Sequence, residues 1–169
     1  MHRYNFVNPA LAETEGADVL QGQAFETGGQ MPYQPVIEAL RLRIERENAP
    51  DDLCSDLWLA ELARLLPELH DRYPDLALPP GEKSVVRNRL FEAVARLGQA
   101  LAARAPLILC IDDVQWADAA SLDVFHYLAR RFTKSETPAL LLLTLRSGRR
   151  PGQPIPRCLH THRRYTRRY

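Results

Sequence analysis

Uninterrupted runs of hydrophobic residues occur at two places in the chain and predict buried strands. Residues 107–111 read Leu-Ile-Leu-Cys-Ile, and residues 139–145 read Ala-Leu-Leu-Leu-Leu-Thr-Leu. Runs of this length without alternating polar positions are typical of strands that are covered on both faces. A shorter stretch, 18–25, predicts a third strand that leads into a loop containing Gly28, Gly29 and Pro32. The sequence therefore predicts strands over 18–25, 107–113 and 139–145.

Hydrophobic residues elsewhere recur with the period of a helix. In 83–104 the apolar positions advance by four, four, three and four residues, which marks one face of a helix. A similar stripe predicts a helix over 119–132, with Asp118 as its N-cap. Further helices are predicted from about Pro35 and over about 55–69. The stripes of the two longer helices consist of Val86, Leu90, Val94, Leu97 and Leu101, and of Leu122, Phe125, Leu128 and Phe132.

Strands that alternate with helices predict a parallel sheet and a layered α/β fold. The length of 169 residues suits one domain. Residues 1–17 show no clear period and are expected to form an atypical N-terminal segment. We therefore expect the folded unit to span 18–147, followed by a tail at 148–169.

The net charge of +1 hides an asymmetry between the body and the tail. Residues 149–169 contain seven Arg and no acidic residue, whereas residues 1–148 carry 15 Lys and Arg against 21 Asp and Glu. A tail with many charges and few apolar residues is expected to be disordered. Such a tail is either a solvated end or a weak, sequence-independent contact for nucleic acid. No apolar run has the length of a membrane span or begins a signal peptide, so we expect a cytoplasmic protein.

The most informative residues for function are Asp112 and Asp113, which follow directly on the run at 107–111. Carboxylates at the carboxyl end of a parallel strand lie where open α/β sheets bind ligands. Two adjacent carboxylates are costly to bury unless a cation or hydrogen-bond donors compensate them. Mg²⁺ prefers such oxygen ligands, so we expect Asp112 to bind the metal and Asp113 to face the attacking water. The alternative is that both acids only turn the chain after the strand.

Arg146 ends the strand predicted at 139–145 and is the second candidate. Its guanidinium would reach the same edge of the sheet and donate two hydrogen bonds to a γ-phosphate. The alternative is a surface residue at the start of the basic tail. Trp116 is expected to pack along the wall of the same crevice.

The chain lacks the Gly-rich loop with Lys and Ser or Thr that usually cradles phosphates. The sequence Gly81-Glu82-Lys83-Ser84 imitates the end of such a loop, but no strand precedes it and an acidic residue separates Gly from Lys. Lys134 follows a helix and has no glycine beside it. Neither lysine of the chain is therefore expected to bind phosphate.

Four motifs together resemble a known family. They are Met-Pro-Tyr-Gln-Pro at 31–35, Arg-Leu-Phe-Glu-Ala-Val at 89–94, the stretch 107–118 with its Asp-Asp-Val-Gln-Trp-Ala-Asp core, and Thr-Leu-Arg at 144–146. The chain is similar to the AAA-type ATPase domain of signal-transduction ATPases with numerous domains, the STAND class. In particular it resembles the ATPase module, akin to origin-recognition ATPases, of large bacterial transcriptional regulators such as LuxR-type and SARP-type proteins.

The resemblance implies an incomplete three-layer P-loop NTPase fold, in which the strand at 107–112 lies between those near 18–22 and 139–145. It assigns Asp112 and Asp113 to the Walker B position and Arg146 to the first sensor position, with ATP and Mg²⁺ as the cofactors of an intact domain. Because no Walker A loop is present, these residues alone are expected to bind neither cofactor well and to hydrolyse nothing. The family's strand order also leaves 139–145 without a neighbour, which favours self-association.

Two other functions remain open from the sequence. One is a non-catalytic module that docks a partner protein through its acidic helical face. The other is nucleic-acid binding through the basic tail, although in a parent regulator DNA would be bound by other domains. No membrane partner is expected.

Overall fold

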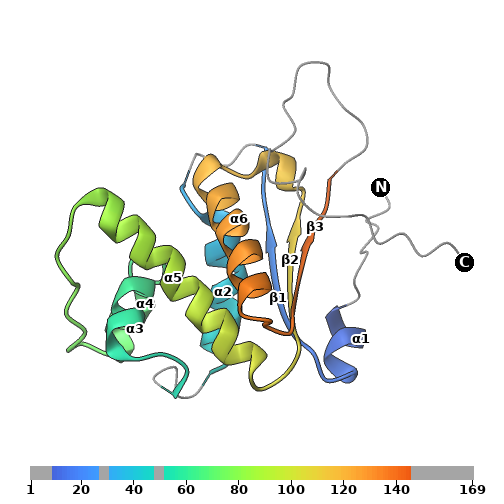
Figure 1. Cartoon of the computed structure of the whole chain (residues 1–169), viewed down its shortest axis with the longest axis horizontal. Coiled ribbons are helices and arrows are strands. Elements are labelled where there is room, and N and C mark those ends of the chain that lie inside the picture. The colour runs from blue at the N-terminus through green and yellow to red at the C-terminus, as the bar shows by residue number, and fades with distance from the viewer. Residues whose placement is uncertain (1–8, 27–30, 48–51, 146–169) are drawn as a thin grey trace, which may run out of the picture.

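The computed structural model describes residues 9–26, 31–47 and 52–145. Helices and strands alternate along these ranges (Figure 1). The elements are α1 (Pro9–Thr14), β1 (Asp18–Gln23), α2 (Gln34–Glu45), α3 (Asp56–Leu62), α4 (Glu68–Arg72), α5 (Lys83–Ala102), β2 (Leu107–Asp112), the 3₁₀ turn η2 (Val114–Trp116), α6 (Ala119–Lys134) and β3 (Ala139–Leu143).

The three strands form one parallel sheet in the order β1-β2-β3. Gln23 lies beside Asp112, and Ile111 lies beside Leu143, so all three strands end at the same edge. The predicted α/β class, the parallel pairing and the central place of the strand at 107–112 are confirmed. The carboxyl edge of this sheet is the place where an open α/β fold binds ligands.

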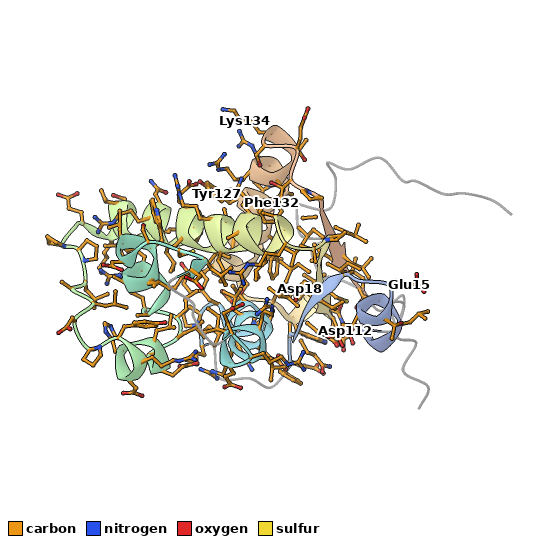
Figure 2. All side chains as sticks on the ribbon, turned by 90° about the horizontal axis from the view of Figure 1, so that it is seen from below. Glu15, Asp18, Asp112, Tyr127, Phe132 and Lys134 are labelled. Atoms are coloured by element: carbon orange, nitrogen blue, oxygen red, sulfur yellow. The ribbon has the colours of Figure 1, made fainter. Side chains whose placement is uncertain are left out.

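Helices α2, α5 and α6 lie on one side of the sheet, and α1 lies on the other (Figures 1 and 2). Parallel strands connected in sequence order, each through a right-handed crossover, place their helices on the same face. Of the helices in the described ranges, only the short α1 contacts the sheet from the opposite side, at β1. Leu140 of β3 is accordingly 53% exposed.

Gly22 allows α2 to approach β1 closely. A Cβ atom at this position would lie 2.0 Å from the carbonyl oxygen of Pro35 and 3.2 Å from the Ile111 side chain. Since the first of these is a backbone atom, no side-chain movement could relieve the clash. A residue without a side chain is therefore needed at position 22, where the start of α2 passes over the pair of Gly22 and Ile111 in β1 and β2.

The helix predicted over 55–69 is wrong in its extent. The segment forms two short helices, α3 and α4, that are separated by residues 63–67, with Pro67 as the N-cap of α4. Proline has no backbone N–H and its ring collides with the preceding turn, so the first helix ends before it. Leu57, predicted on the apolar face, is 45% exposed.

The region at 1–17 is more structured than its lack of period suggested, since α1 covers Pro9–Thr14 and packs against β1. Its six residues are too few to show a helical stripe. Two other expectations fall outside the described residues: the position of Arg146 and the disorder of 148–169.

The core fills the space between the sheet and helices α2, α5 and α6, and it continues between α5 and α3. Its largest fully buried side chains come from α3 to α6 and β2, and include Leu59, Leu62, Leu97, Leu101, Ile111, Phe125 and Leu128. One charged residue, Glu61, is fully buried among them. Its carboxylate forms ion pairs with Arg64 and Arg89, both at 2.8 Å. The described helices include none whose length and hydropathy would suit a bilayer crossing.

Candidate functional site at the carboxyl edge of the sheet

The site begins where β2 ends, at Asp112 and Asp113. Asp112 is the last residue of the strand and is half-buried, whereas Asp113 is 6% exposed. The backbone of Asp113 is left-handed, with φ 55° and ψ 41°. Aspartate tolerates this conformation better than most residues, and it turns the chain sharply from β2 into η2. The two carboxylates therefore leave the strand in different directions despite being adjacent in sequence.

Thr144, directly after β3, fastens this turn through four hydrogen bonds. Its hydroxyl donates to Oδ1 of Asp112 and accepts the N–H of Asp113, at 3.1 Å. Its N–H donates to the carbonyl of Ile111, and its carbonyl accepts the N–H of Val114, both at 3.0 Å. Thr144 is thus hydrogen-bonded to four consecutive residues, from Ile111 near the end of β2 to Val114 in η2.

The hydrogen bonds of Asp112 leave one carboxylate oxygen available. Oδ1 accepts from the Thr144 hydroxyl and from the N–H of Asp113, at 3.1 Å. In the described part of the chain, Oδ2 makes no hydrogen bond or ion pair. A half-buried carboxylate with one oxygen fixed and the other free suits a single ligand to Mg²⁺.

The same region does not form a metal site without further ligands. No group of three or more His, Cys, Asp or Glu side chains among residues 9–26, 31–47 and 52–145 is arranged to hold a metal ion. Mg²⁺ usually binds one or two carboxylates together with phosphate oxygens and water. Asp112 therefore fits the metal only as the protein's share of a Mg²⁺–phosphate complex.

Asp113 is held by its own neighbour in the turn. The side-chain amide of Gln115 donates to Oδ1 of Asp113 at 3.0 Å. The backbone carbonyl of Asp113 accepts from the N–H of Trp116 at 3.0 Å, which closes η2.

Burial raises the pKa of the Cys110 thiol, and the charge of Asp112 raises it further. Cys110 is thus a neutral, buried part of the strand.

Asp118 caps α6, as predicted, and also contacts a second motif. Oδ1 accepts from the N–H of Ser121 at 2.9 Å, and Oδ2 accepts from the N–H of Tyr33 at 3.2 Å. Tyr33 has a left-handed backbone, with φ 66°, and precedes α2. Burial raises the pKa of the Tyr33 hydroxyl; the charge of Arg87 opposes this shift, and the charges of Asp118 and Asp123 add to it.

The motifs quoted from the sequence meet around these residues. The ring of Tyr33 packs edge-on against Phe91, with 6.3 Å between centroids, and Phe91 packs against Tyr127 at 5.7 Å. Glu92 accepts a hydrogen bond from the Tyr127 hydroxyl at 2.7 Å. The motifs at 31–35, 89–94 and 107–118 therefore form one contiguous structure beneath the site.

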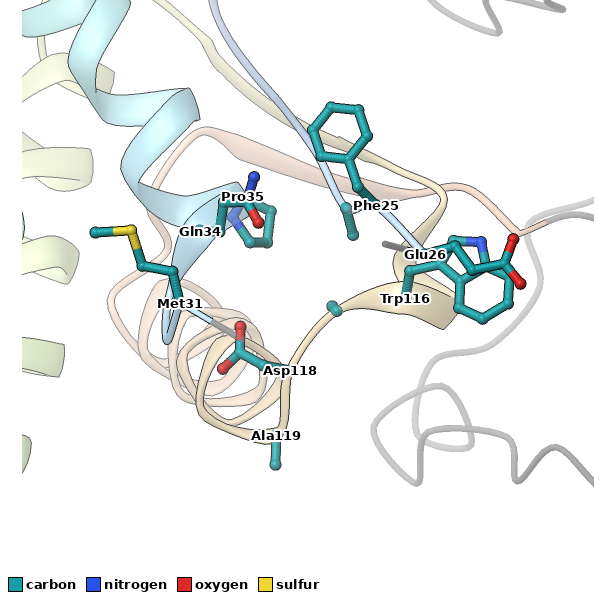
Figure 3. A pocket seen from close by; sticks show the side chains of 10 residues that line it. Phe25, Glu26, Met31, Gln34, Pro35, Trp116, Asp118 and Ala119 are labelled. Carbon is teal, nitrogen blue, oxygen red and sulfur yellow. The ribbon is translucent and has the colours of Figure 1, made fainter. Parts of the chain in front are cut away.

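A hollow of about 420 Å³ lies at the carboxyl edge of the sheet (Figure 3). The end of β1 and the first residues of α2 and α6 form its walls, with Phe25, Pro35, Trp116 and Asp118 among the lining side chains. Trp116 thus lines a crevice at this edge of the sheet, as predicted. Asp112, Asp113 and Thr144 do not line it. The candidate metal ligand is on the β3 side of β2, and the hollow is on the β1 side.

Sequence reasoning placed the two aspartates correctly at the end of the central strand but missed Thr144 and Gln115. The signal for Thr144 was present, because it is the one polar residue in the run at 139–145. Gln115 gave no such signal, since only the left-handed turn at Asp113 brings its amide to the carboxylate. The side chain of Arg146 lies outside the described residues, and its role stays a prediction.

Comparison with known proteins gives one match. Residues 7–143 match the model of a family described as AAA ATPase domain. No curated protein and no solved structure matches the chain.

Proposed function

Because the chain belongs to the AAA ATPase domain family, we propose that its strand end at Asp112 and Asp113 is the Mg²⁺- and γ-phosphate-facing part of an ATP-binding site. We further propose that the site belongs to a STAND-class signalling or transcriptional regulator, in which ATP binding switches the protein between resting and active states. This finer assignment rests on the four sequence motifs and places the protein in the cytoplasm.

The observation that carries the proposal is the arrangement of Asp112. Oδ1 accepts hydrogen bonds from two donors, the N–H of Asp113 and the hydroxyl of Thr144 directly after β3, while Oδ2 is left for a cation. Mg²⁺ bound there would neutralise charge on the β- and γ-phosphate oxygens.

Asp113 and Arg146 would divide the remaining work. Asp113 would accept a proton from the attacking water. Its carboxylate is held by Gln115 rather than by Thr144, so it is separate from the proposed metal ligand, Asp112. Arg146 follows Thr144 by two residues in the sequence, and we propose that it reaches the edge where β2 and β3 both end. From there its guanidinium would distinguish ATP from ADP by binding the γ-phosphate.

The 169 residues supply no cradle for the phosphates, because they contain no Gly-rich loop followed by Lys and Ser or Thr. Such a loop provides the backbone N–H donors and the helix N-terminus that bind phosphate oxygens. We therefore propose that these residues alone bind Mg·ATP no more tightly than about 1 mM, roughly −4 kcal/mol. Hydrolysis by them alone is expected to be undetectable.

The test compares two chains by calorimetry and by phosphate release. The first is the 169-residue chain, and the second carries a family-like strand and phosphate loop ahead of residue 7, where the family match begins. The second chain should bind Mg·ATP in the micromolar range. In it, Asp113→Asn should reduce turnover more than binding, and Arg146→Ala should reduce the preference for ATP over ADP. Micromolar binding by the unaltered chain would show that the loop is not limiting.

A second candidate is a non-catalytic interaction module, which the sparsely covered face of the sheet favours. Leu140 is 53% exposed there, and β3 has no further strand beside it in the described ranges. Self-association or partner binding through this face would survive Asp112→Ala. Loss of such binding in that variant would count against the interaction module.

A further inference from the structure

Gln115 carries a buried hydrogen-bond acceptor that the ATPase assignment does not explain. Its side-chain amide donates to Oδ1 of Asp113 at 3.0 Å. An ionised carboxylate only accepts hydrogen bonds, so the NH₂ group of the amide must face Asp113. The orientation of the amide is therefore fixed, and its Oε1 atom is left without a role in the bond to that carboxylate.

Oε1 of Gln115 is buried and has no hydrogen-bond partner in the described part of the chain. A buried acceptor without a donor is costly, and in folded proteins such atoms are usually satisfied by an ordered water or a ligand. Gln115 cannot relieve this cost by turning its amide over, because its NH₂ group would then leave Asp113. The donor has to come from outside the described side chains.

We propose that Gln115 is a positioning residue that holds an ordered water molecule next to Asp113. The water would donate one hydrogen to Oε1 of Gln115 and lie beside the carboxylate that the same amide orients. Water is favoured over an apolar occupant because the surrounding groups, one amide and one carboxylate, supply polar partners.

The inferred role of this water rests on the proposed function of Asp113. During hydrolysis its oxygen would bond to the γ-phosphorus while the bond from that phosphorus to the β,γ-bridging oxygen breaks, leaving ADP. The proton released from the water would pass to Asp113. Gln115 would then fix both the base and the nucleophile, and would itself exchange no proton.

The presence of the water can be tested in the 169-residue chain without nucleotide. Cross-relaxation between water and the side-chain amide protons of Gln115 should show the sign of a bound molecule in the NMR spectrum. The magnetic relaxation dispersion of solvent ¹⁷O counts long-lived water molecules through its amplitude. In Gln115→Met, which keeps the shape of the side chain but lacks the amide, this amplitude should fall by the contribution of one water. Gln99→Met is the matched control, because Gln99 bonds Ser135 on the exposed surface of α5.

A folded wild-type chain with no bound water at the Gln115 amide would overturn the proposal, even if Gln115→Met failed to fold. Equal loss of amplitude in Gln115→Met and Gln99→Met would overturn it as well. These outcomes are separate from the test of the ATP site. A water found at Gln115, together with a loop-bearing chain that fails to bind Mg·ATP, would refute the proposed function while leaving the positioning of the water intact.

Discussion

The hydroxyl of Thr144 donates a hydrogen bond to Oδ1 of Asp112, although 32 positions separate the two residues. The same hydroxyl accepts the N–H of Asp113. Because an ionised carboxylate cannot donate, the Thr144 hydroxyl must donate its proton to Asp112, and a lone pair of the hydroxyl oxygen accepts the N–H of Asp113. One side chain directly after β3 thus orients the proposed metal ligand and stabilises the left-handed turn at Asp113.

Replacing Thr144 by Val should destabilise the chain by about 1–2 kcal/mol, since it removes the hydrogen bonds that the hydroxyl makes with Oδ1 of Asp112 and with the N–H of Asp113. Thr144→Ser keeps the hydroxyl and should lose much less. Urea denaturation of the three proteins measures the difference. Equal stability of the Val and Ser variants would show that the hydroxyl does not hold the turn.

The buried carboxylate of Glu61 should be among the most sensitive positions in the helical layer. Glu61 is fully buried, and its partners Arg64 and Arg89 are 28% and 23% exposed. Removing one partner of a buried ion pair leaves the others uncompensated, so Glu61→Ala should cost roughly 3 kcal/mol. Glu68→Ala is the control, because its pair with Arg41 is exposed and should contribute less than about 1 kcal/mol. Similar losses in both variants would contradict this ranking.

Glu92 should make the folded chain lose stability in acid. Burial alone would raise the pKa of Glu92, but hydrogen bonds from Arg131 and Tyr127, together with the charges of Arg131 and Arg96, outweigh it and hold the pKa below its ordinary value of 4.5. A group whose pKa is lowered on folding stabilises the fold above its unfolded pKa, and the stabilisation is lost as the pH falls through the folded pKa. The free energy of unfolding should therefore fall as the pH is lowered below about 4.5.

Glu92→Gln should flatten this part of the pH profile, because glutamine does not titrate. Urea denaturation at a series of pH values between neutral and acid measures it. An unchanged slope in the variant would assign the acid sensitivity to other carboxylates. Glu47, which Arg43 and Arg104 hold at a lowered pKa against the effect of burial, is the first of these.

The exposed side of β3 should make the isolated chain self-associate. Its sequence, Ala-Leu-Leu-Leu-Leu, contains no charge or proline that would discourage pairing with another strand. Leu140→Lys should therefore raise the concentration at which the chain stays monomeric. Leu42→Lys provides a close control, since Leu42 is also 53% exposed but lies on helix α2. Light scattering and sedimentation measure the change, and equal improvement by both variants would contradict the role of the strand edge.

The sequence predicted the elements whose residues share a strong period. The stripe of α5 and the apolar runs of β2 and β3 are long enough to be recognised, and Asp118 bonds the N–H of Ser121 as an N-cap does. The break between α3 and α4 was missed because the leucines on both sides of Pro67 continue an apolar pattern. Burial of Glu61 was also missed, since charge alone places glutamate at the surface and only the fold brings Arg89 to it.

The candidate site was predictable only as far as it depends on position along a strand. Asp112 and Asp113 follow directly from the run that precedes them, and parallel pairing brings Thr144 to the same edge. The strand fixes the place of Asp112, but the left-handed φ angle of Asp113 turns the chain into η2, and no periodic pattern encodes that angle. That turn brings the amide of Gln115 to the Asp113 carboxylate.

The central claim is that Asp112 is the protein's ligand to Mg²⁺ in a nucleotide site. Its most direct test is the magnesium dependence of ATP binding by the chain that carries a phosphate loop ahead of residue 7, measured by calorimetry for Asp112→Asn and for Asp123→Asn. Asp123 lies on α6, where its carboxylate pairs with Arg87 at the surface. We expect Asp112→Asn to abolish the gain in ATP affinity that Mg²⁺ provides and Asp123→Asn to retain it. An undiminished Mg²⁺ effect in Asp112→Asn would contradict the claim.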